Sequence, residues 1–382
     1  MRVTWQQVTA RRIARHFLAD AAGLAGAGHT DAPGRPDIPA AVSAMGGAHA
    51  QIMSAAELSI GVRVPGTTRA DVRAAVGDTL VKTFGPRGTV HLIAISDLGL
   101  FSGALSRVPS RQLQPADLRL SEEQLDAVVA AIADALAGDP LTMAELGDAV
   151  VARAGDWAGE LVLPAFQGMW PRWRLALSTA AFRAALCFGP NRGTAVTYTR
   201  PPAFEPVADA DVALLHRYLR SYGPATAADF ARWLSAPVDW AEEVAGRTDL
   251  DPVEVGGTVT WVVGGDIEFP DAAPSGIRLL PYFDAYQVGA HPRDQLFPGR
   301  AAERALSRGQ AGNFPVLLVD GVVGGVWHQK RSGKRIQVTV EPLTPLTRTQ
   351  RTELEAQAHR IGAILEGEAT LTVGEVTVGP HA

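Results

Sequence analysis

YLRSYGPATAADFARW (residues 218–233) contains two helical runs that Gly223 and Pro224 interrupt. Thr226 is a good N-cap for the second run, and Asp229, three residues later, favours a helix N-terminus. A helix, a tight turn and a second helix then follow one another at the spacing of a helix-turn-helix. This stretch therefore predicts a helix-turn-helix unit.

Helices followed by paired strands recur along the rest of the chain. Thr4 with Gln7, and Ser121 with Gln124, have the capping-box spacing that opens a helix. The Gly-rich and Pro-rich stretch 22–37 predicts a loop. The predicted helices span 4–20, 67–78, 121–136, 139–155, 169–189, a broken pair over 210–234, and 347–367; the predicted strand-rich stretches span 80–95, 253–265, 276–289 and 314–343.

These blocks predict an α+β fold of tandem winged-helix modules, in which each helix-turn-helix carries a β-hairpin wing, with a strand-rich C-terminal part. A length of 382 residues exceeds what one hydrophobic core usually organises. The predicted modules are residues 1–120, residues 121–205, and residues 206–382, the last with the C-terminal strands and the final helix.

Composition predicts a folded chain, with 47% apolar and 20% charged residues. Cys187 is the one cysteine of the chain, which excludes an internal disulfide and a multi-thiolate metal site, and we expect no metal and no cofactor. No apolar run reaches the length of about 18 residues that spans a membrane. We therefore expect a cytoplasmic protein without membrane contact.

Positive charge gathers at one predicted hairpin although the formal net charge is −5. Four cations, Lys330, Arg331, Lys334 and Arg335, flank a Ser-Gly turn, and Arg87 stands at the tip of the first predicted hairpin. Such tips suit contact with DNA phosphates. The alternative is a solubilised turn that protects an edge strand.

The stretch GGAHAQIMSAAELS (residues 46–59) places His49 and Gln51 one residue apart, between a Gly-Gly pair and a predicted helix. Residues two apart diverge on a helix but point the same way in an extended segment. We predict an extended lead-in that projects both side chains into one cleft. The alternative is that His49 caps the helix and Gln51 is solvated.

Several segments, in this order, resemble the winged-helix DNA glycosylases of the AlkZ and YcaQ family. GGAHAQ stands where that family has its catalytic Gln-x-Gln or Gln-x-Asp motif, with His49 in place of the first Gln. FGPRGTVHLIAISDL is similar to its Arg-Gly-Thr-x-His segment, and YLRSYGPATAADFARW to its helix-turn-helix. LLPYFDAYQVG and VDGVVGGVW resemble its C-terminal strands, so the resemblance extends from about residue 4 to about residue 365.

The resemblance implies a monomeric, nucleoid-associated DNA glycosylase that acts on double-stranded DNA with an alkylated purine. A purine alkylated at N7 is positively charged and departs readily, so the protein must position a water at the anomeric carbon and stabilise a cationic sugar. Gln51 can hold the water, and His49 can accept its proton, because an unperturbed imidazole titrates near neutrality. We expect activity to fall on the acid side of neutrality as His49 protonates. No lysine stands at the motif, which favours a monofunctional enzyme.

Family members of the Gln-x-Gln type are associated with self-resistance to DNA-alkylating natural products. The resemblance therefore implies bulky N7-alkylguanine adducts, and interstrand crosslinks among them, as substrates. Two alternatives from other classes are a winged-helix transcriptional regulator without chemistry and a scaffold whose wings bind acidic partners. We expect His91 to be a buried, hydrogen-bonded structural residue. The roles of Asp284 and Arg293, at a cleft, in packing or at a strand-end turn, stay open at this point.

Overall fold

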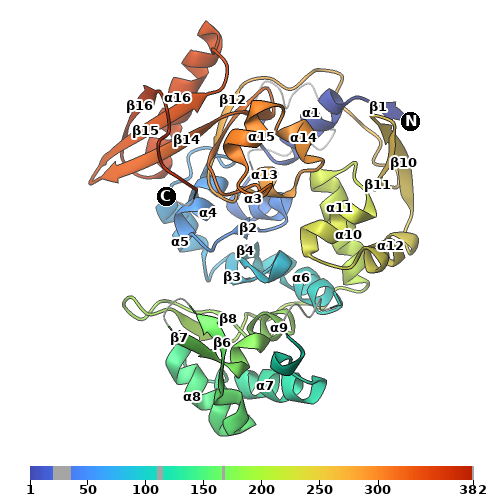
Figure 1. Ribbon diagram of the computed structural model, residues 1–382, viewed down its shortest axis with the longest axis vertical. Coiled ribbons are helices and arrows are strands. Elements are labelled where there is room, and N and C mark those ends of the chain that lie inside the picture. The colour runs from blue at the N-terminus through green and yellow to red at the C-terminus, as the bar shows by residue number, and fades with distance from the viewer. Residues whose placement is uncertain (20–35, 110–114, 166–167, 381–382) are drawn as a thin grey trace.

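The computed structural model describes residues 1–19, 36–109, 115–165 and 168–380. Apart from its last two residues, the predicted loop 22–37 lies outside these ranges. The fold is α+β, as predicted, and its elements form three helical segments and a C-terminal sheet (Figure 1).

The first segment consists of helices around a small sheet in which β4 lies between β2 and β3. The predicted hairpin 80–95 forms as β3 and β4, and Thr68 caps the predicted helix that follows residue 67. The elements are α3 (Ile38–Met45), β2 (Ala48–His49), α4 (Met53–Gly61), α5 (Arg69–Ala75), β3 (Leu80–Phe84), the 3-10 turns η1 (Pro86–Gly88) and η2 (Ile95–Asp97), β4 (Val90–Ala94) and α6 (Leu98–Leu105).

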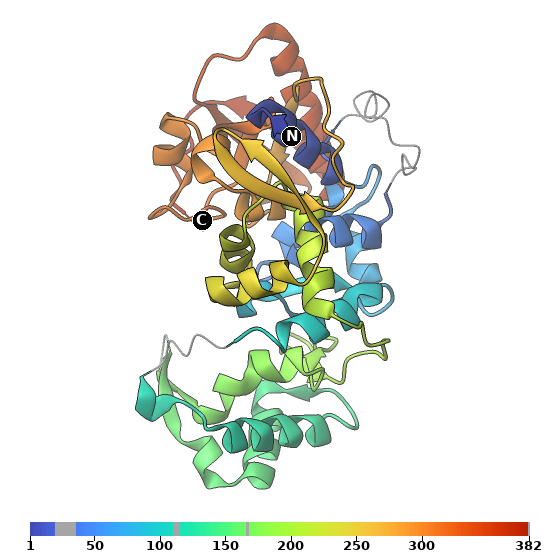
Figure 2. The ribbon, with the colours of Figure 1, turned by 90° about the vertical axis from the view of Figure 1, so that its right-hand side faces the viewer.

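The second segment forms the lower lobe in Figures 1 and 2 and has a hydrophobic core of its own, which includes Leu146 and Trp173. Its elements are η3 (Ala116–Leu118), α7 (Glu122–Ala135), β5 (Leu141–Thr142), α8 (Met143–Ala154), η4 (Asp156–Gly159), β6 (Leu161–Ala165), β7 (Gly168–Pro171), η5 (Arg172–Ala176), α9 (Leu177–Phe182), β8 (Cys187–Phe188) and β9 (Thr197–Thr199).

The predicted helix over 169–189 is wrong. Its first residues form β7, which pairs with β6 in an antiparallel hairpin, and only α9 within the range is an α-helix. Pairing with β6 holds residues 168–171 extended, and Ala184 adopts a φ of +56°, which interrupts the range near its other end.

The third segment contains the predicted helix-turn-helix. Thr226 and Asp229 form a reciprocal capping box at the start of the second helix, and Ala225 pairs with Trp261 at the edge of the sheet. The elements are α10 (Ala210–Tyr222), α11 (Ala227–Leu234), α12 (Val238–Gly246), β10 (Leu250–Val255) and β11 (Thr258–Val263).

The first segment has the order helix, strand, helix, helix, strand, strand. The second has the same order with the hairpin β6–β7 inserted before α9, and in the third the bridge residue Ala225 stands in place of the first strand. In each, the last strand lies between the other two: the orders are β2-β4-β3, β5-β9-β8, and Ala225-β11-β10. The assignment of these strand pairs as wings stays a prediction.

The N-terminal elements pack with the third segment, and Ile13 also belongs to the core shared with the first. β1 (Arg2–Val3) pairs in parallel with β10, and α1 (Trp5–Arg15) contacts α10. α1 also ends earlier than the predicted residue 20, because Phe17 takes a φ of +54°.

The C-terminal sheet has the strand order β12-β13-β14-β15-β16, antiparallel except for the last pair. One hydrophobic core joins this sheet to the first and third segments, through residues such as Leu58, Tyr222 and Trp327. The elements are β12 (Ile277–Leu280), α13 (Ala285–Gly289), α14 (Arg293–Leu296), α15 (Arg300–Ala305), β13 (Val316–Val319), β14 (Val322–Ser332), β15 (Arg335–Pro342), α16 (Arg348–Ile364) and β16 (Glu368–Val373).

Candidate active site

A sharp corner between α3 and β2 places His49. Gly46 and Gly47 form this corner with φ values of +68° and +98°, a backbone region that residues with a Cβ rarely adopt. β2 then pairs with β4, so that His49 stands opposite His91 in the register. The predicted extended lead-in is therefore present at His49, and His49 does not cap α4.

The His49 ring lies in a narrow cleft that is closed by aromatic groups. The centroid of its ring is 4.6 Å from that of Phe283 and 5.3 Å from that of His91. Arg87 and Trp233 also line this cleft. Neither nitrogen of the His49 ring hydrogen-bonds to another described residue, and Nδ1 is buried.

The environment keeps His49 uncharged at neutral pH. Burial, and then the positive charge of Arg87, lower its pKa to about 4. His91 is also neutral, because burial, Arg87 and His49 hold its pKa well below the usual value. The expectation that His49 titrates near neutrality is therefore wrong, since it assumed an unperturbed imidazole.

Gln51 does not share the cleft of His49. β2 ends at His49, and Gln51 lies exposed in the bend that precedes α4, so the alternation of an extended strand does not continue to it. Gln51 instead lines a hollow of about 800 Å³ between the first and second segments. The two hollows adjoin, because His49 and Arg87 line one while the neighbouring residues Ala50 and Gly88 line the other.

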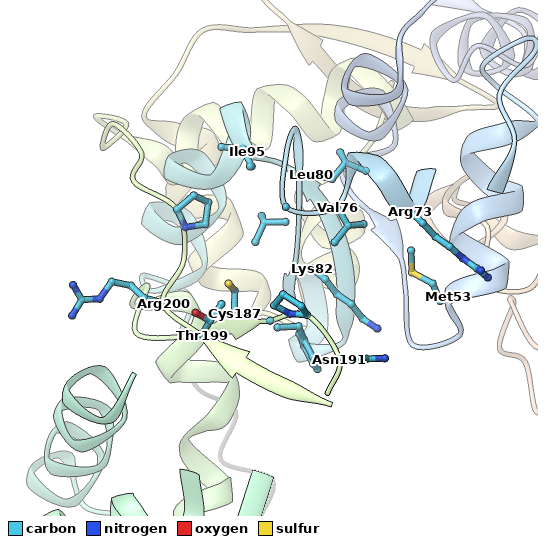
Figure 3. A pocket seen from close by; sticks show the side chains of 16 residues that line it. Met53, Arg73, Val76, Leu80, Lys82, Ile95, Cys187, Asn191, Thr199 and Arg200 are labelled. Carbon is cyan, nitrogen blue, oxygen red and sulfur yellow. The ribbon is translucent and has the colours of Figure 1, made fainter. Parts of the chain in front are cut away.

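A further hollow, of about 850 Å³, lies between β3 and the strands β8 and β9. Figure 3 shows Leu80 and Lys82 on its β3 side, and Cys187 and Thr199 on the other. Lys82 lines both this hollow and the hollow of Gln51. The Nζ atom of Lys82 lies 5.2 Å from the ring centroid of Phe188, and burial lowers the pKa of the lysine. Burial raises the pKa of the Cys187 thiol to about 12, so this cysteine is not a thiolate at neutral pH.

Arg87 is not an exposed hairpin tip. It adopts a φ of +63° within η1, which folds the tip against α11, and its Nη1 donates to the Trp233 carbonyl at 2.9 Å. Burial lowers the pKa of its guanidinium. The structure thus brings Arg87 beside His49, whereas the sequence predicted a phosphate contact for it.

The basic hairpin belongs to the C-terminal sheet, as the turn between β14 and β15, and is not the wing of the third segment. Lys330, Lys334 and Arg335 are exposed there. Arg331 is exposed too, but its Nη1 donates to the Leu365 carbonyl at 2.7 Å.

His91 and Asp284 are buried and hydrogen-bonded, whereas Arg293 is half-buried and hydrogen-bonded. The structural role predicted for His91 is confirmed by its burial and its hydrogen bond. Asp284 forms a fully buried ion pair with Arg63, at 2.8 Å, and holds the loop that carries Phe283. Arg293 donates to three carbonyls of its own loop, among them that of Ala290. His91 is buried, and its Nδ1 lies 2.8 Å from the Thr89 carbonyl, but its ring also lines the His49 cleft.

Sequence reasoning missed Phe283 and Trp233 as cleft residues. Both stand in motifs whose periodicity indicates packing, and nothing local shows that residues so far apart in the chain converge on His49. Within the described ranges, no three His, Cys, Asp or Glu side chains cluster as metal ligands would. The same ranges contain no helix that combines the length and the apolar character of a membrane span.

A family model described as "DNA glycosylase AlkZ-like" matches residues 42–364. The chain belongs to this family. It is also 31% identical, over 348 residues, to a curated protein of Streptomyces sahachiroi named "Interstrand DNA cross-link repair glycosylase"; the match covers 86% of this chain and 88% of that relative.

The solved structure of the Streptomyces sahachiroi DNA glycosylase AlkZ matches this AlkZ-like glycosylase with a TM-score of 0.78 and 26% identity. The match covers 98% of this chain and 100% of that structure. The family resemblance noted in the sequence is thus confirmed, and so is the prediction of a DNA glycosylase. An AlkZ-like glycosylase is an enzyme that acts on DNA, which leaves no support for the regulator and scaffold alternatives.

Proposed function

We propose that this AlkZ-like glycosylase excises bulky N7-alkylguanine adducts, including interstrand crosslinks, from double-stranded DNA as a monomer. The observation that carries the proposal is the neutral, unpartnered imidazole of His49 in a cleft that adjoins the hollow of Gln51. The name of the Streptomyces sahachiroi relative supports crosslinks as substrates. A role in self-resistance to a DNA-alkylating natural product follows from the resemblance of the motif to the Gln-x-Gln type.

The reaction breaks the bond between C1′ and N9. The alkylated guanine leaves with the bonding electrons, which neutralise its positive charge, and C1′ becomes an oxocarbenium-like cation. His49 suits this step because a neutral imidazole does not repel the cation, whereas a protonated one would raise its free energy. A neutral imidazole also carries one unprotonated nitrogen that can accept a proton from water.

Gln51 and His49 then have complementary roles in the proposal. The amide oxygen of Gln51 orients the water, and His49 takes the proton as the oxygen bonds to C1′. Their hollows meet along residues 49–51 and 87–88, and the sugar would lie at this junction.

A monofunctional reaction, which leaves an intact abasic site, is part of the proposal. Lys82 lines the Gln51 hollow and is the residue that could form a Schiff base instead, because a lysine whose pKa is lowered is a better nucleophile. Trapping with borohydride separates the two outcomes. A covalent complex that disappears in Lys82→Met would contradict the monofunctional reaction.

The test is a single-turnover incubation with duplex DNA that carries one N7-alkylguanine, followed by alkaline cleavage of abasic sites. We expect His49→Ala and Gln51→Ala each to lower the rate by about 100-fold or more, as for the loss of a general base or its partner. Affinity for the duplex should stay within about twofold, since such groups act on the transition state.

His328→Ala, which removes a histidine of β14 that does not line the cleft, is the matched control and should retain the rate. Full activity in both His49→Ala and Gln51→Ala would place the site elsewhere. Absence of excision by the native protein from simple and bulky adducts would contradict the proposed substrate class.

A further inference from the structure

The corner that places His49 begins at a carbonyl that has no donor within its own helix. Met45 is the last residue of α3, and the carbonyls in the last turn of a helix lack intrahelical partners. The N–H groups of Gly46 and Gly47 bond to carbonyls earlier in α3, so they do not pair with the Met45 carbonyl. A buried carbonyl without a donor is costly. The group that pairs with it therefore also fixes the direction of the peptide that opens the corner.

The donor to this carbonyl is Tyr222, the last residue of α10. Its hydroxyl donates to the Met45 carbonyl at 2.6 Å, and both residues are buried. Burial raises the pKa of the Tyr222 hydroxyl, which therefore keeps its proton and stays a donor at neutral pH. Tyr222 also lines the His49 cleft. The third segment is thus hydrogen-bonded to the end of α3, directly before the corner.

The ring of Tyr222 has little freedom to move. The ring centroids of His16 and Tyr218 lie 4.9 and 5.3 Å from its own. Gly289 of α13 lies so close to the ring that a Cβ built on this glycine would overlap it. Because neighbours enclose the ring on several sides, the hydroxyl is held in one place, and the Met45 carbonyl is held with it.

We propose that Tyr222 is a positioning residue, whose hydroxyl holds the end of α3 so that the corner presents His49 to the reacting sugar. This inference rests on the proposed function, in which His49 accepts a proton from water. A general base must lie within hydrogen-bond reach of that proton. Displacement of a catalytic group by about 1 Å can cost about 100-fold in rate, so a loose corner slows the reaction.

The test is Tyr222→Phe, which removes the hydroxyl and keeps the ring. The assay is the single-turnover incubation with duplex DNA that carries one N7-alkylguanine. We expect the rate at saturating protein to fall by about 10-fold, less than the loss for a displacement of a full ångström. Affinity for the duplex should stay within about twofold, because a group that only positions His49 acts on the transition state.

Two other buried tyrosines are matched controls. Tyr286 of α13 donates its hydroxyl to the Gly321 carbonyl at 2.9 Å and does not line the cleft, so Tyr286→Phe loses the same kind of bond elsewhere. Tyr218 lies on α10 with Tyr222, and its buried hydroxyl has no partner among the described residues. Tyr286→Phe should lower the thermal midpoint about as much as Tyr222→Phe, because each leaves one buried carbonyl unpaired. Both controls should retain the native rate.

Histidine ring signals in the NMR spectrum of the free protein report on the corner without any substrate. The His49 signal, identified by its loss in His49→Ala, should shift in Tyr222→Phe and stay in place in both controls. Failure of the native protein to excise N7-alkylguanine would contradict the proposed function. The His49 signal would still show whether the hydroxyl holds the corner.

Two results would overturn the inference. A native rate or an unmoved His49 signal in Tyr222→Phe would mean that the corner holds His49 without the hydroxyl. An equal fall in rate for Tyr222→Phe and Tyr286→Phe would mean that excision follows overall stability and not the position of His49.

Discussion

His49 shows how the surroundings of one side chain change its chemistry. A histidine in water has a pKa near 6.5 and would be partly protonated at neutral pH. Burial beside Phe283, together with the charge of Arg87, lowers the pKa of His49 to about 4, which keeps the imidazole neutral and able to accept a proton. Arg87 thus favours the neutral state of His49 that the proposed mechanism requires.

Replacing Arg87 should therefore move the acid limb of the pH-rate profile. Activity needs neutral His49, so the rate of the native protein should fall only as the pH drops toward about 4. Arg87→Met removes the second cause of the low pKa while burial, the larger one, remains. The limb should shift upward but stay below about 6.5.

Arg87→Lys is the control, because it keeps a positive charge, and its limb should stay near that of the native protein. Single-turnover rates between pH 4 and 8, corrected for spontaneous depurination, measure the acid limb of each variant. Coincident profiles of the Met and Lys variants would show that the charge of Arg87 does not act on His49.

The corner between α3 and β2 connects a helix end to the candidate site. Gly46 ends α3 with its backbone in the left-handed region. It lies against the ring of Trp233 on α11, and a Cβ built on Gly46 would be 2.9 Å from Cζ2 of that ring. Gly47 packs against His91, with 3.4 Å between a Cβ built on it and Cδ2 of the ring. The two glycines thus let two segments of the fold close around His49.

Gly46→Ala should destabilise the fold more than Gly66→Ala. Both glycines have a positive φ, but a Cβ at Gly66 would meet nothing within 4 Å, so that variant carries only the backbone cost of about 1–2 kcal/mol. The overlap with Trp233 adds about 1–3 kcal/mol to Gly46→Ala. Urea unfolding measures the difference, and only Gly46→Ala should also lower the excision rate.

Equal stability of the two variants would show that α11 yields at Trp233 without cost. In that case the tight corner would not be what positions His49.

The complete chain assembles the candidate site from distant segments. His49 and Arg87 come from the first segment, Trp233 from the third and Phe283 from the loop before α13, and the core that unites these segments excludes most of the second. The basic hairpin lies on the C-terminal sheet, apart in sequence from all of them (Figure 1). We propose that Lys330, Arg331, Lys334 and Arg335 contact DNA phosphates there.

Neutralising the hairpin should weaken the salt dependence of duplex binding. In a variant with Lys330→Gln, Lys334→Gln and Arg335→Gln, the slope of log K against log salt should decrease in magnitude by about 0.9 for each phosphate that the hairpin no longer neutralises. Arg331 is left in place because it also supports the Leu365 carbonyl. Arg348→Gln removes an exposed cation on α16 and should leave the slope unchanged.

Binding titrations at several salt concentrations measure this slope. A triple variant with the native slope would favour the alternative, in which the charges solubilise an exposed turn.

Local patterns predicted most helices and strands, because caps and apolar spacing act within a few residues. The capping boxes at Thr4, Ser121 and Thr226 all form. The error over 169–189 arose where an apolar run suited helix and strand alike, and pairing with β6 decided between them. The attachment of β1 to β10 joins the two ends of a long stretch of chain, for which no local pattern exists.

Residue types and their order were enough to predict the α+β class and the AlkZ-like family, because caps, apolar spacing and family motifs each lie within neighbouring residues. The catalytic role of the motif that contains His49 and Gln51 stays a prediction. Tertiary structure decided that His49 and Gln51 line adjoining but separate hollows, that Arg87 is turned inward, and that His49 stays neutral. Burial and charge at a site depend on which distant segments surround it, and packing sets these.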